Sequence, residues 1–281
     1  MRRLLTFLAM ALALVGVIAA PGGAVTGGQP DGEGHPYGAL LLAPGLTFCT
    51  GSLIAERTIL TAGHCTDFWD QLTDAGELTG PIMVSFDSQA SVDEDWMPDG
   101  GTWYEASSWL THPDYVEAAW PFTYDYGLLY LDESPGIEPA DLPAAGALTP
   151  IIEGNGQTDQ RFDDVGYGVQ GQIHGGGPPL SAITWTRKVA TQRYAPGNGG
   201  PSALLHPTWF IVQNSPSPRH GGSCGGDSGS PVLFADTDMV VAVHTGGYRL
   251  GRDGVICGRI TSLNHRIDPP DVLAWVTAND V

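Results

Sequence analysis

Short runs of apolar, or alternating apolar and polar, residues follow one another along most of this chain, separated by glycine, proline, aspartate or asparagine. The clearest runs cover residues 48–55, 57–65, 82–86, 102–112, 126–132, 183–194, 208–214, 230–234, 239–247 and 258–264. Runs of this length predict β-strands, and the 39 glycines and 22 prolines predict many turns. Because helical patterns do not separate the strands, we expect an all-β fold, either a sandwich or a barrel.

Two other segments bear on the organisation of the fold. Residues 132–150 are rich in proline and have little periodicity, so they are predicted to connect two halves of similar size. A helix is predicted only at the end of the chain, where Asp268 can cap it and two prolines suit its first turn. Its predicted apolar face contains Val272, Leu273 and Val276.

The first residues are typical of a secretory signal peptide. Arg2 and Arg3 precede an apolar run over 4–20, which ends at Pro21. An uncleaved membrane anchor is the alternative, but the run is at the lower limit for crossing a bilayer. We expect a signal peptide over residues 1–24, with cleavage after Ala19 or Ala24. The mature chain is then secreted, with no stable membrane anchor.

Charge and cysteine content narrow the function classes further. The formal net charge of −19, from 12 basic and 31 acidic residues, argues against a nucleic-acid partner. Four cysteines in an exported chain favour disulfides over a metal site, and no CxxC pair suggests zinc. Three pairings are open. Pairing in sequence order would close short loops beside His64 and Ser228, each bridge being worth about 3 kcal/mol on a chain-entropy estimate.

Three segments carry residues suited to nucleophilic catalysis. GGSCGGDSGSPV (221–232) surrounds Ser228 with glycines, ILTAGHC (59–65) supplies His64, and YDYGLLYLD (124–132) supplies Asp125. A serine hydroxyl needs a base, a group that orients the base, and N–H donors for the developing oxyanion. The glycines let the backbone turn so that the Gly226 and Ser228 N–H groups could point at one spot.

Together these segments resemble the chymotrypsin-like, or trypsin-like, serine protease family, in LTAGHC, DYGLL and GDSGSP. The chain order histidine, aspartate, serine distinguishes this family from subtilisins and α/β-hydrolases. The resemblance runs from VTGG at 25–28 to the C-terminal helix. It implies two six-stranded antiparallel β-barrels, which we expect over residues 25–140 and 141–281, with a C-terminal helix in the second unit.

The resemblance also implies a role for each residue of the motifs. Ser228 becomes the nucleophile, His64 the general acid and base, and Asp125 the buried carboxylate that fixes the histidine tautomer. Asp114 of THPDY is a nearby rival, but it reads as a turn residue. The Gly226 and Ser228 amides form the oxyanion hole, and no cofactor or metal is required. The family's bridges match the pairs Cys49–Cys65 and Cys224–Cys257.

The segments expected to govern activation and specificity match the family's pattern less closely than the three motifs do. Val25-Thr26-Gly27-Gly28 is similar to the family's new N-terminus, so cleavage after Ala24 would allow the Val25 ammonium to pair with Asp227. The position of the tryptic pocket aspartate is Gly222, which predicts an uncharged pocket suited to apolar or aromatic side chains. Asp253 could still reach it. The other expected pocket residues are Ser223, Thr245, Gly247 and Gly258.

The leading hypothesis is thus a monomeric, secreted serine endopeptidase that acts on protein or peptide substrates. Two alternatives stay open: a non-catalytic binding or scaffold protein on the same fold, and an esterase. The acidic segment 92–96 is interpreted as a solvated loop, with a calcium site as the alternative.

Overall fold

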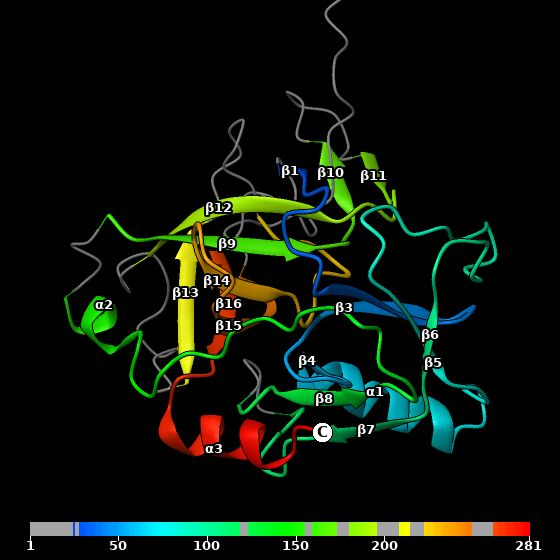
Figure 1. The fold of residues 1–281 in the computed structure, drawn as a ribbon, viewed down its shortest axis with the longest axis horizontal. Helices are drawn as coiled ribbons and strands as arrows, with labels where there is room; N and C mark the ends of the chain where they lie inside the picture. Colours follow the sequence, from blue (N-terminus) through cyan, green and yellow to red (C-terminus); the bar gives the residue numbers. More distant parts are fainter. Residues whose placement is uncertain are drawn as a thin grey trace, which may run out of the picture.

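The computed structural model describes residues 25, 28–118, 123–154, 159–172, 180–195, 208–213, 222–248 and 261–281. Within these residues two antiparallel sheets make up most of the fold (Figure 1). The expected signal peptide over residues 1–24 lies outside the described residues, as do Asp253, Cys257 and Gly258.

The first sheet closes into a barrel. Its strands, in spatial order, are β6 (Tyr104–Ala106), β5 (Ile82–Ser85), β2 (Gly38–Ala43), β3 (Thr47–Leu53), β4 (Thr58–Thr61), β8 (Gly127–Tyr130) and β7 (Ser108–Thr111). The two outer strands, β6 and β7, are separated by Ser107 alone, so they are two parts of one bent strand. This bend joins the two edges of the sheet, and the barrel has six strands in effect.

The second sheet closes in the same manner. Its spatial order is β1 (Gln29–Pro30), β12 (Lys188–Tyr194), β13 (Trp209–Gln213), β16 (Thr261–Arg266), β15 (Val240–Tyr248), β14 (Pro231–Phe234) and β9 (Arg161–Gly166). Strand β12 pairs with β9 as well as β13, which closes a six-stranded ring. Strand β1 adds a seventh strand to β12, and β10 (Gln170–Gln172) pairs with β11 (Leu180–Ala182) as a separate hairpin. The expected all-β fold with two six-stranded barrels is confirmed.

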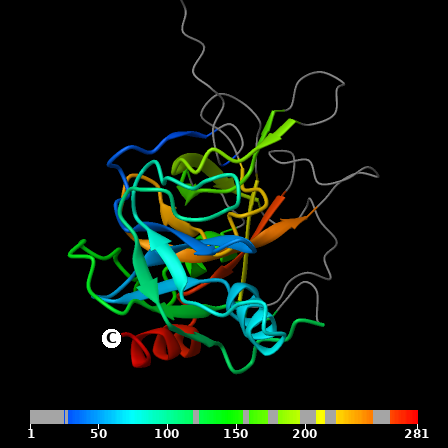
Figure 2. The same ribbon diagram turned by 90° about the vertical axis from the view of Figure 1, so that its right-hand side faces the viewer.

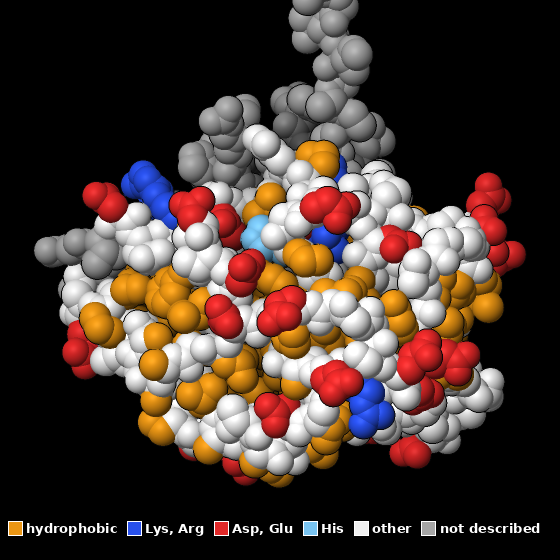
Figure 3. All heavy atoms as spheres, viewed as in Figure 1, with side chains coloured by type: hydrophobic (Ala, Val, Ile, Leu, Met, Phe, Trp, Pro, Cys, Tyr) orange, Lys and Arg blue, Asp and Glu red, His pale blue; other side chains and the backbone are white. Residues whose placement is uncertain are grey.

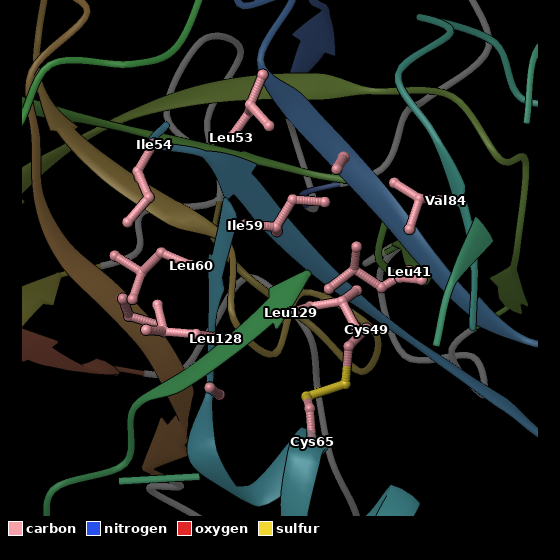
Figure 4. Packing of buried hydrophobic residues seen from close by; sticks show 14 of the residues in the cluster. Leu41, Cys49, Leu53, Ile54, Ile59, Leu60, Cys65, Val84, Leu128 and Leu129 are labelled. Carbon is pink, nitrogen blue, oxygen red and sulfur yellow. A yellow bond between two sulfur atoms is a disulfide. The ribbon is translucent and has the colours of Figure 1, made fainter. Parts of the chain in front are cut away.

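Strand β2 is buried on both faces, which explains its unbroken apolar sequence GALLLA. Leu41 points into the first barrel, among Cys49, Ile59, Val84 and Leu129 (Figure 4). Leu40 and Leu42 alternate with it and belong to a different cluster, which includes Tyr167 from the segment after β9. Because successive strand residues point to opposite faces, one strand lines the barrel core and also contacts the second half of the chain.

Helices differ from the expectation in two respects. Helix α1 (Gly63–Asp74) begins where the sequence indicated a continuing strand, and a short α2 (Thr149–Glu153) precedes the second barrel. The predicted C-terminal helix is present as α3 (Pro270–Ala278), with Val272 and Val276 buried. However, Asp268 does not cap it. Its carboxylate instead accepts hydrogen bonds from Arg266 and from the Leu148 N–H.

Helix α3 follows the last strand of the second barrel but packs against the first barrel, at the bottom of both ribbon views (Figures 1 and 2). The ring of Trp275 lies 4.6 Å from that of His112, and the Tyr124 hydroxyl donates to Asp271 at 3.4 Å. The end of the chain also returns to the first barrel, where the Arg57 N–H donates to the Val281 carbonyl. The C-terminal segment therefore ties the two halves together.

Among the charged side chains on the surface drawn in Figure 3, the acidic ones predominate. On the face drawn in Figure 3, Asp and Glu side chains are scattered widely, and Lys and Arg side chains are few. This matches the excess of acidic residues in the sequence. No helix in the described ranges has the length and apolar character needed to cross a bilayer.

Candidate active site

His64 lies in the first turn of α1, immediately after β4 ends. Gly63 makes this position possible, because a Cβ there would lie 2.9 Å from backbone atoms of Tyr126. Gly127 has the same role on the facing strand, since its Cβ would lie 2.9 Å from the Ala62 carbonyl. The two glycines therefore let the start of α1 touch the segment that carries Asp125.

Asp125 holds His64 by two hydrogen bonds. One carboxylate oxygen accepts the His64 backbone N–H at 2.6 Å, and the other lies 2.9 Å from ring Nδ1. The Asp125 side chain is fully buried, whereas that of His64 is 22% exposed. Because a carboxylate can only accept, this contact assigns the proton to Nδ1, so Nε2 is the ring nitrogen that can act as a base.

The charges of this pair shift both pKa values. Burial alone would raise the pKa of Asp125, but the charge and hydrogen bond of His64, with a contribution from His265, lower it. Burial alone would lower the pKa of His64, but Asp125 and the charge of Asp67 outweigh this effect and raise it. The rival Asp114 is exposed, and its backbone N–H donates to His112. Of the two candidates, Asp125 is the one bonded to His64.

The loop that carries Ser228 is built against strands of the first barrel. Gly226 has φ +91° and Gly229 has φ +84°, conformations that favour glycine. Side chains could not be accommodated here either, because a Cβ at 226 would overlap the Phe48 ring and one at 229 would overlap the Thr50 carbonyl. The tight contact between the two barrels thus accounts for both glycines.

His64, Gly226 and Ser228 line one cavity of about 340 Å³. The cavity wall also includes Cys49 and Cys65, whose sulfur atoms form the predicted disulfide. This bridge is confirmed, and it joins β3 to the first turn of α1 (Figure 4). Of the second predicted bridge, Cys224 is described and buried, whereas Cys257 lies outside the described residues.

Asp227 is fully buried directly before the candidate nucleophile. Its two carboxylate oxygens accept the N–H groups of Gly168 at 2.7 Å and Cys224 at 2.8 Å. Burial, reinforced by the charge of Asp164, raises its pKa well above the usual range, although the backbone hydrogen bonds act in the opposite direction. The proposed partner, Val25, is also buried, and its carbonyl accepts the Gly28 N–H.

Two of the expected specificity residues, Ser223 and Gly247, adjoin a residue that the sequence did not indicate, Ser262. Ser223 is buried, and its hydroxyl lies 2.5 Å from that of Ser262. Ser262 pairs with Gly247 across β15 and β16. Gly222 is buried beside Ser223, and Gly258 lies outside the described residues. Ser262 was missed because its position depends on the register of two strands.

Thr245 has a partner of its own. Its hydroxyl lies 2.6 Å from Nδ1 of His265, and both side chains are buried. Neighbouring His244 is buried as well, its Nδ1 being 3.0 Å from the Asn264 side-chain oxygen, and burial lowers its pKa to about 4. A layer of buried polar side chains thus lies next to the His64–Asp125 pair, with which His244 and His265 interact electrostatically.

The described ranges contain no group of three or more His, Cys, Asp or Glu side chains arranged to hold a metal ion. In the acidic segment 92–96, one Asp93 oxygen accepts the backbone N–H groups of Asp95 and Met97. The carboxylate thus caps its own turn.

Known proteins resemble this chain in sequence and in fold. The model of the family described as Trypsin matches residues 25–165, half of the chain. Serine protease SP24D of Anopheles gambiae is 27% identical over 224 residues, which cover 79% of this chain and 71% of that protein. Serine protease 1 of Drosophila melanogaster is 27% identical over 241 residues, 82% of this chain and 77% of that protein.

A solved structure described as HL collagenase has the same fold. It superposes with a TM-score of 0.64 at 17% sequence identity, and the match covers 92% of this chain and 100% of that one. At this identity the likeness concerns the fold alone. Together with the family match, it means that this chain belongs to the trypsin-like serine protease family.

Proposed function

We propose that this protein is a secreted serine endopeptidase in which Ser228, His64 and Asp125 form a catalytic triad. The observation that carries the proposal is the double hydrogen bond from His64 to a fully buried Asp125, beside a cavity that Ser228 also lines. The raised pKa of His64 supports a role as base, because Asp125 stabilises the imidazolium that forms during the reaction.

The proposed reaction proceeds through an acyl-enzyme. His64 Nε2 removes the proton from the Ser228 hydroxyl while Oγ attacks the carbonyl carbon of the scissile peptide bond. The oxyanion accepts hydrogen bonds from the Gly226 and Ser228 N–H groups. The C–N bond then breaks, and His64 returns the proton to the leaving amine. Water, activated by the same imidazole, releases the acyl group and regenerates Ser228.

For specificity, we propose a preference for an apolar or aromatic residue before the cleaved bond. The described residues place two hydroxyl groups at the Ser223–Ser262 contact, and the facing strand presents Gly246 and Gly247. An open, uncharged site favours a large apolar group. A cleavage profile dominated by Arg and Lys would contradict this part of the proposal.

For activation, we propose that removal of residues 1–24 frees the Val25 ammonium to pair with Asp227. The support is a buried carboxylate with two backbone N–H donors, whose pKa is raised well above the usual range by burial and by the charge of Asp164. A cation beside it would offset both effects. Sequencing the N-terminus of the secreted, active protein tests this proposal. A start at any residue other than Val25 would contradict it.

The proposed organisation of the mature chain remains a first unit over 25–140 and a second over 141–281, acting as a monomer. One experiment tests the activity against its alternatives: incubation of mature protein with a fluorophosphonate probe and, separately, with casein. Labelling of Ser228 together with casein cleavage supports the endopeptidase. Labelling without cleavage indicates an esterase, and neither result would indicate a non-catalytic scaffold. Ser228→Ala provides the unlabelled control.

A further inference from the structure

Thr50 lies in β3, one residue after the disulfide-bonded Cys49, and it is fully buried. We propose that its side-chain hydroxyl is a positioning group that holds the oxyanion hole in its working shape. This inference rests on the function proposed above, and it adds a residue that the sequence motifs did not single out.

Thr50 binds the nucleophile loop at two points. Its hydroxyl donates to the Gly226 carbonyl at 2.9 Å, and its backbone N–H donates to the Ser228 carbonyl at 2.8 Å. The direction of the first bond is fixed because a carbonyl oxygen can only accept, and the hydroxyl oxygen in turn accepts the Tyr167 N–H at 3.3 Å. One residue of the first barrel thus holds the carbonyls of both residues whose N–H groups would bind the oxyanion.

The two hydrogen bonds from Thr50 restrict the backbone at Gly226, the most flexible residue type in the loop. Gly226 has no side chain of its own to limit its backbone, and glycine has more conformational freedom than any other residue. With the Gly226 and Ser228 carbonyls fixed, the intervening Asp227 peptide groups have little room to rotate. The Asp227 side chain restricts them further, through its bonds to Gly168 and Cys224.

Thr50 is itself held in place from the opposite side. Its carbonyl accepts the Thr61 hydroxyl at 2.8 Å, a bond between β3 and β4 within the first barrel. Thr50 therefore attaches the Ser228 loop of the second barrel to the strand pair β3–β4 of the first barrel. The same strand pair leads into α1, which carries His64. Through this link, His64 and the N–H groups of Gly226 and Ser228 are held by the same pair of strands.

The hydroxyl is expected to act on the transition state rather than on substrate binding. Charge develops at the oxyanion only as the tetrahedral species forms, so loosening its donors lowers kcat with little change in KM. Loss of one uncharged hydrogen bond from this frame is expected to lower kcat about 10-fold. A purely structural role would instead lower stability and leave kcat of the folded protein unchanged.

The test compares Thr50→Val, which keeps the shape and the backbone N–H, with Thr50→Ser, which keeps the hydroxyl. Thr58→Val is a matched control, because Thr58 is also a fully buried threonine of the first barrel and its hydroxyl bonds to Val281 instead. All variants are made in the mature protein. The readouts are the rate of fluorophosphonate labelling, which does not depend on the specificity pocket, and kcat and KM on a cleaved peptide.

We expect T50V to label about 10-fold more slowly than wild type, with kcat reduced and KM retained. T50S and T58V are expected to stay within about 2-fold of wild type, although T58V is destabilised in urea as much as T50V. Equal labelling rates for T50V and T58V would overturn the proposal. If T50V does not fold, Thr50→Ala is measured in its place with the same criterion. An unlabelled wild type would instead overturn the proposed function.

Discussion

Asp125 accepts two hydrogen bonds from one residue, His64: the ring Nδ1 lies at 2.9 Å from one carboxylate oxygen and the backbone N at 2.6 Å from the other. The second bond fixes the start of α1, and the first fixes the imidazole. Orientation of the base therefore depends on a single buried side chain from a strand-end segment 61 residues away.

Asp125→Asn is expected to lower kcat by about 10⁴-fold, because the amide can donate to Nδ1 and favour the wrong imidazole tautomer. The fold is expected to survive, since the amide is nearly isosteric. The measurement is kcat on a peptide substrate, alongside circular dichroism. Asp114→Asn, at the exposed rival, serves as the control and should keep wild-type kcat. A D125N protein with more than a tenth of wild-type kcat would refute the assigned role.

The pH dependence of kcat/KM should show an acid limb with its midpoint above the ordinary histidine pKa of about 6.5. The pKa of His64 is raised because burial, which lowers it, is outweighed by Asp125 and Asp67. The base must be neutral, so activity falls as pH drops through this pKa. Asp67→Asn should move the midpoint to lower pH. A wild-type midpoint below 6.5 would be inconsistent with this geometry.

The raised pKa of His64 also makes the free energy of unfolding depend on pH. Its contribution to stability decreases as pH rises, whereas activity increases. Because the folded-state pKa of His64 is raised, its contribution is full below the unfolded-state pKa and is lost as pH rises through the folded-state pKa. Urea unfolding of the Ser228→Ala protein at several pH values measures this contribution without self-digestion. Comparison with S228A/D125N isolates it, because the pH-dependent difference between the two should shrink toward alkaline pH.

Removing the Cys49–Cys65 bridge, with both cysteines changed to serine, should lower the free energy of unfolding by about 3 kcal/mol. The bridge closes a loop over a sequence separation of 16 and lines the cavity beside His64. Equilibrium urea unfolding measures the loss. The disulfide-free protein should also have a lower kcat, because α1 is then tied to β3 only by non-covalent contacts. An unchanged unfolding midpoint would contradict this expectation.

Arg187→Met should destabilise the fold by about 3 to 5 kcal/mol. Arg187 is buried, and its guanidinium donates to the Asp31 carboxylate at 2.7 Å and to the carbonyls of Phe86 and Gly32 at 2.8 Å. The variant leaves the Asp31 carboxylate buried and removes its ion pair with Arg187, while its contact with His35 is retained. The double variant D31N/R187M should recover part of the loss in urea unfolding. No recovery would mean that the lost carbonyl contacts, rather than the stranded charge, dominate.

The alternation of the sequence determined the all-β class, and the motif order indicated the family and the residues 64, 125 and 228. These features are local, because a strand pattern or a glycine-rich turn is encoded within a few neighbouring residues. The start of α1 was not predicted from the run 57–65. It depends on Gly63 meeting the backbone of Tyr126, a contact between segments distant in sequence.

Only the tertiary structure decided the register of the paired strands and the contacts between the two barrels. Ser262 faces Ser223 because β15 and β16 pair in one register, and Thr50 reaches Gly226 across 176 residues of chain. Many weak contacts, summed over whole strands, select such arrangements, and no short stretch of sequence contains that sum. The sequence by itself thus determined which side chains could react, while the packing of one barrel on the other decided which groups hold them in place.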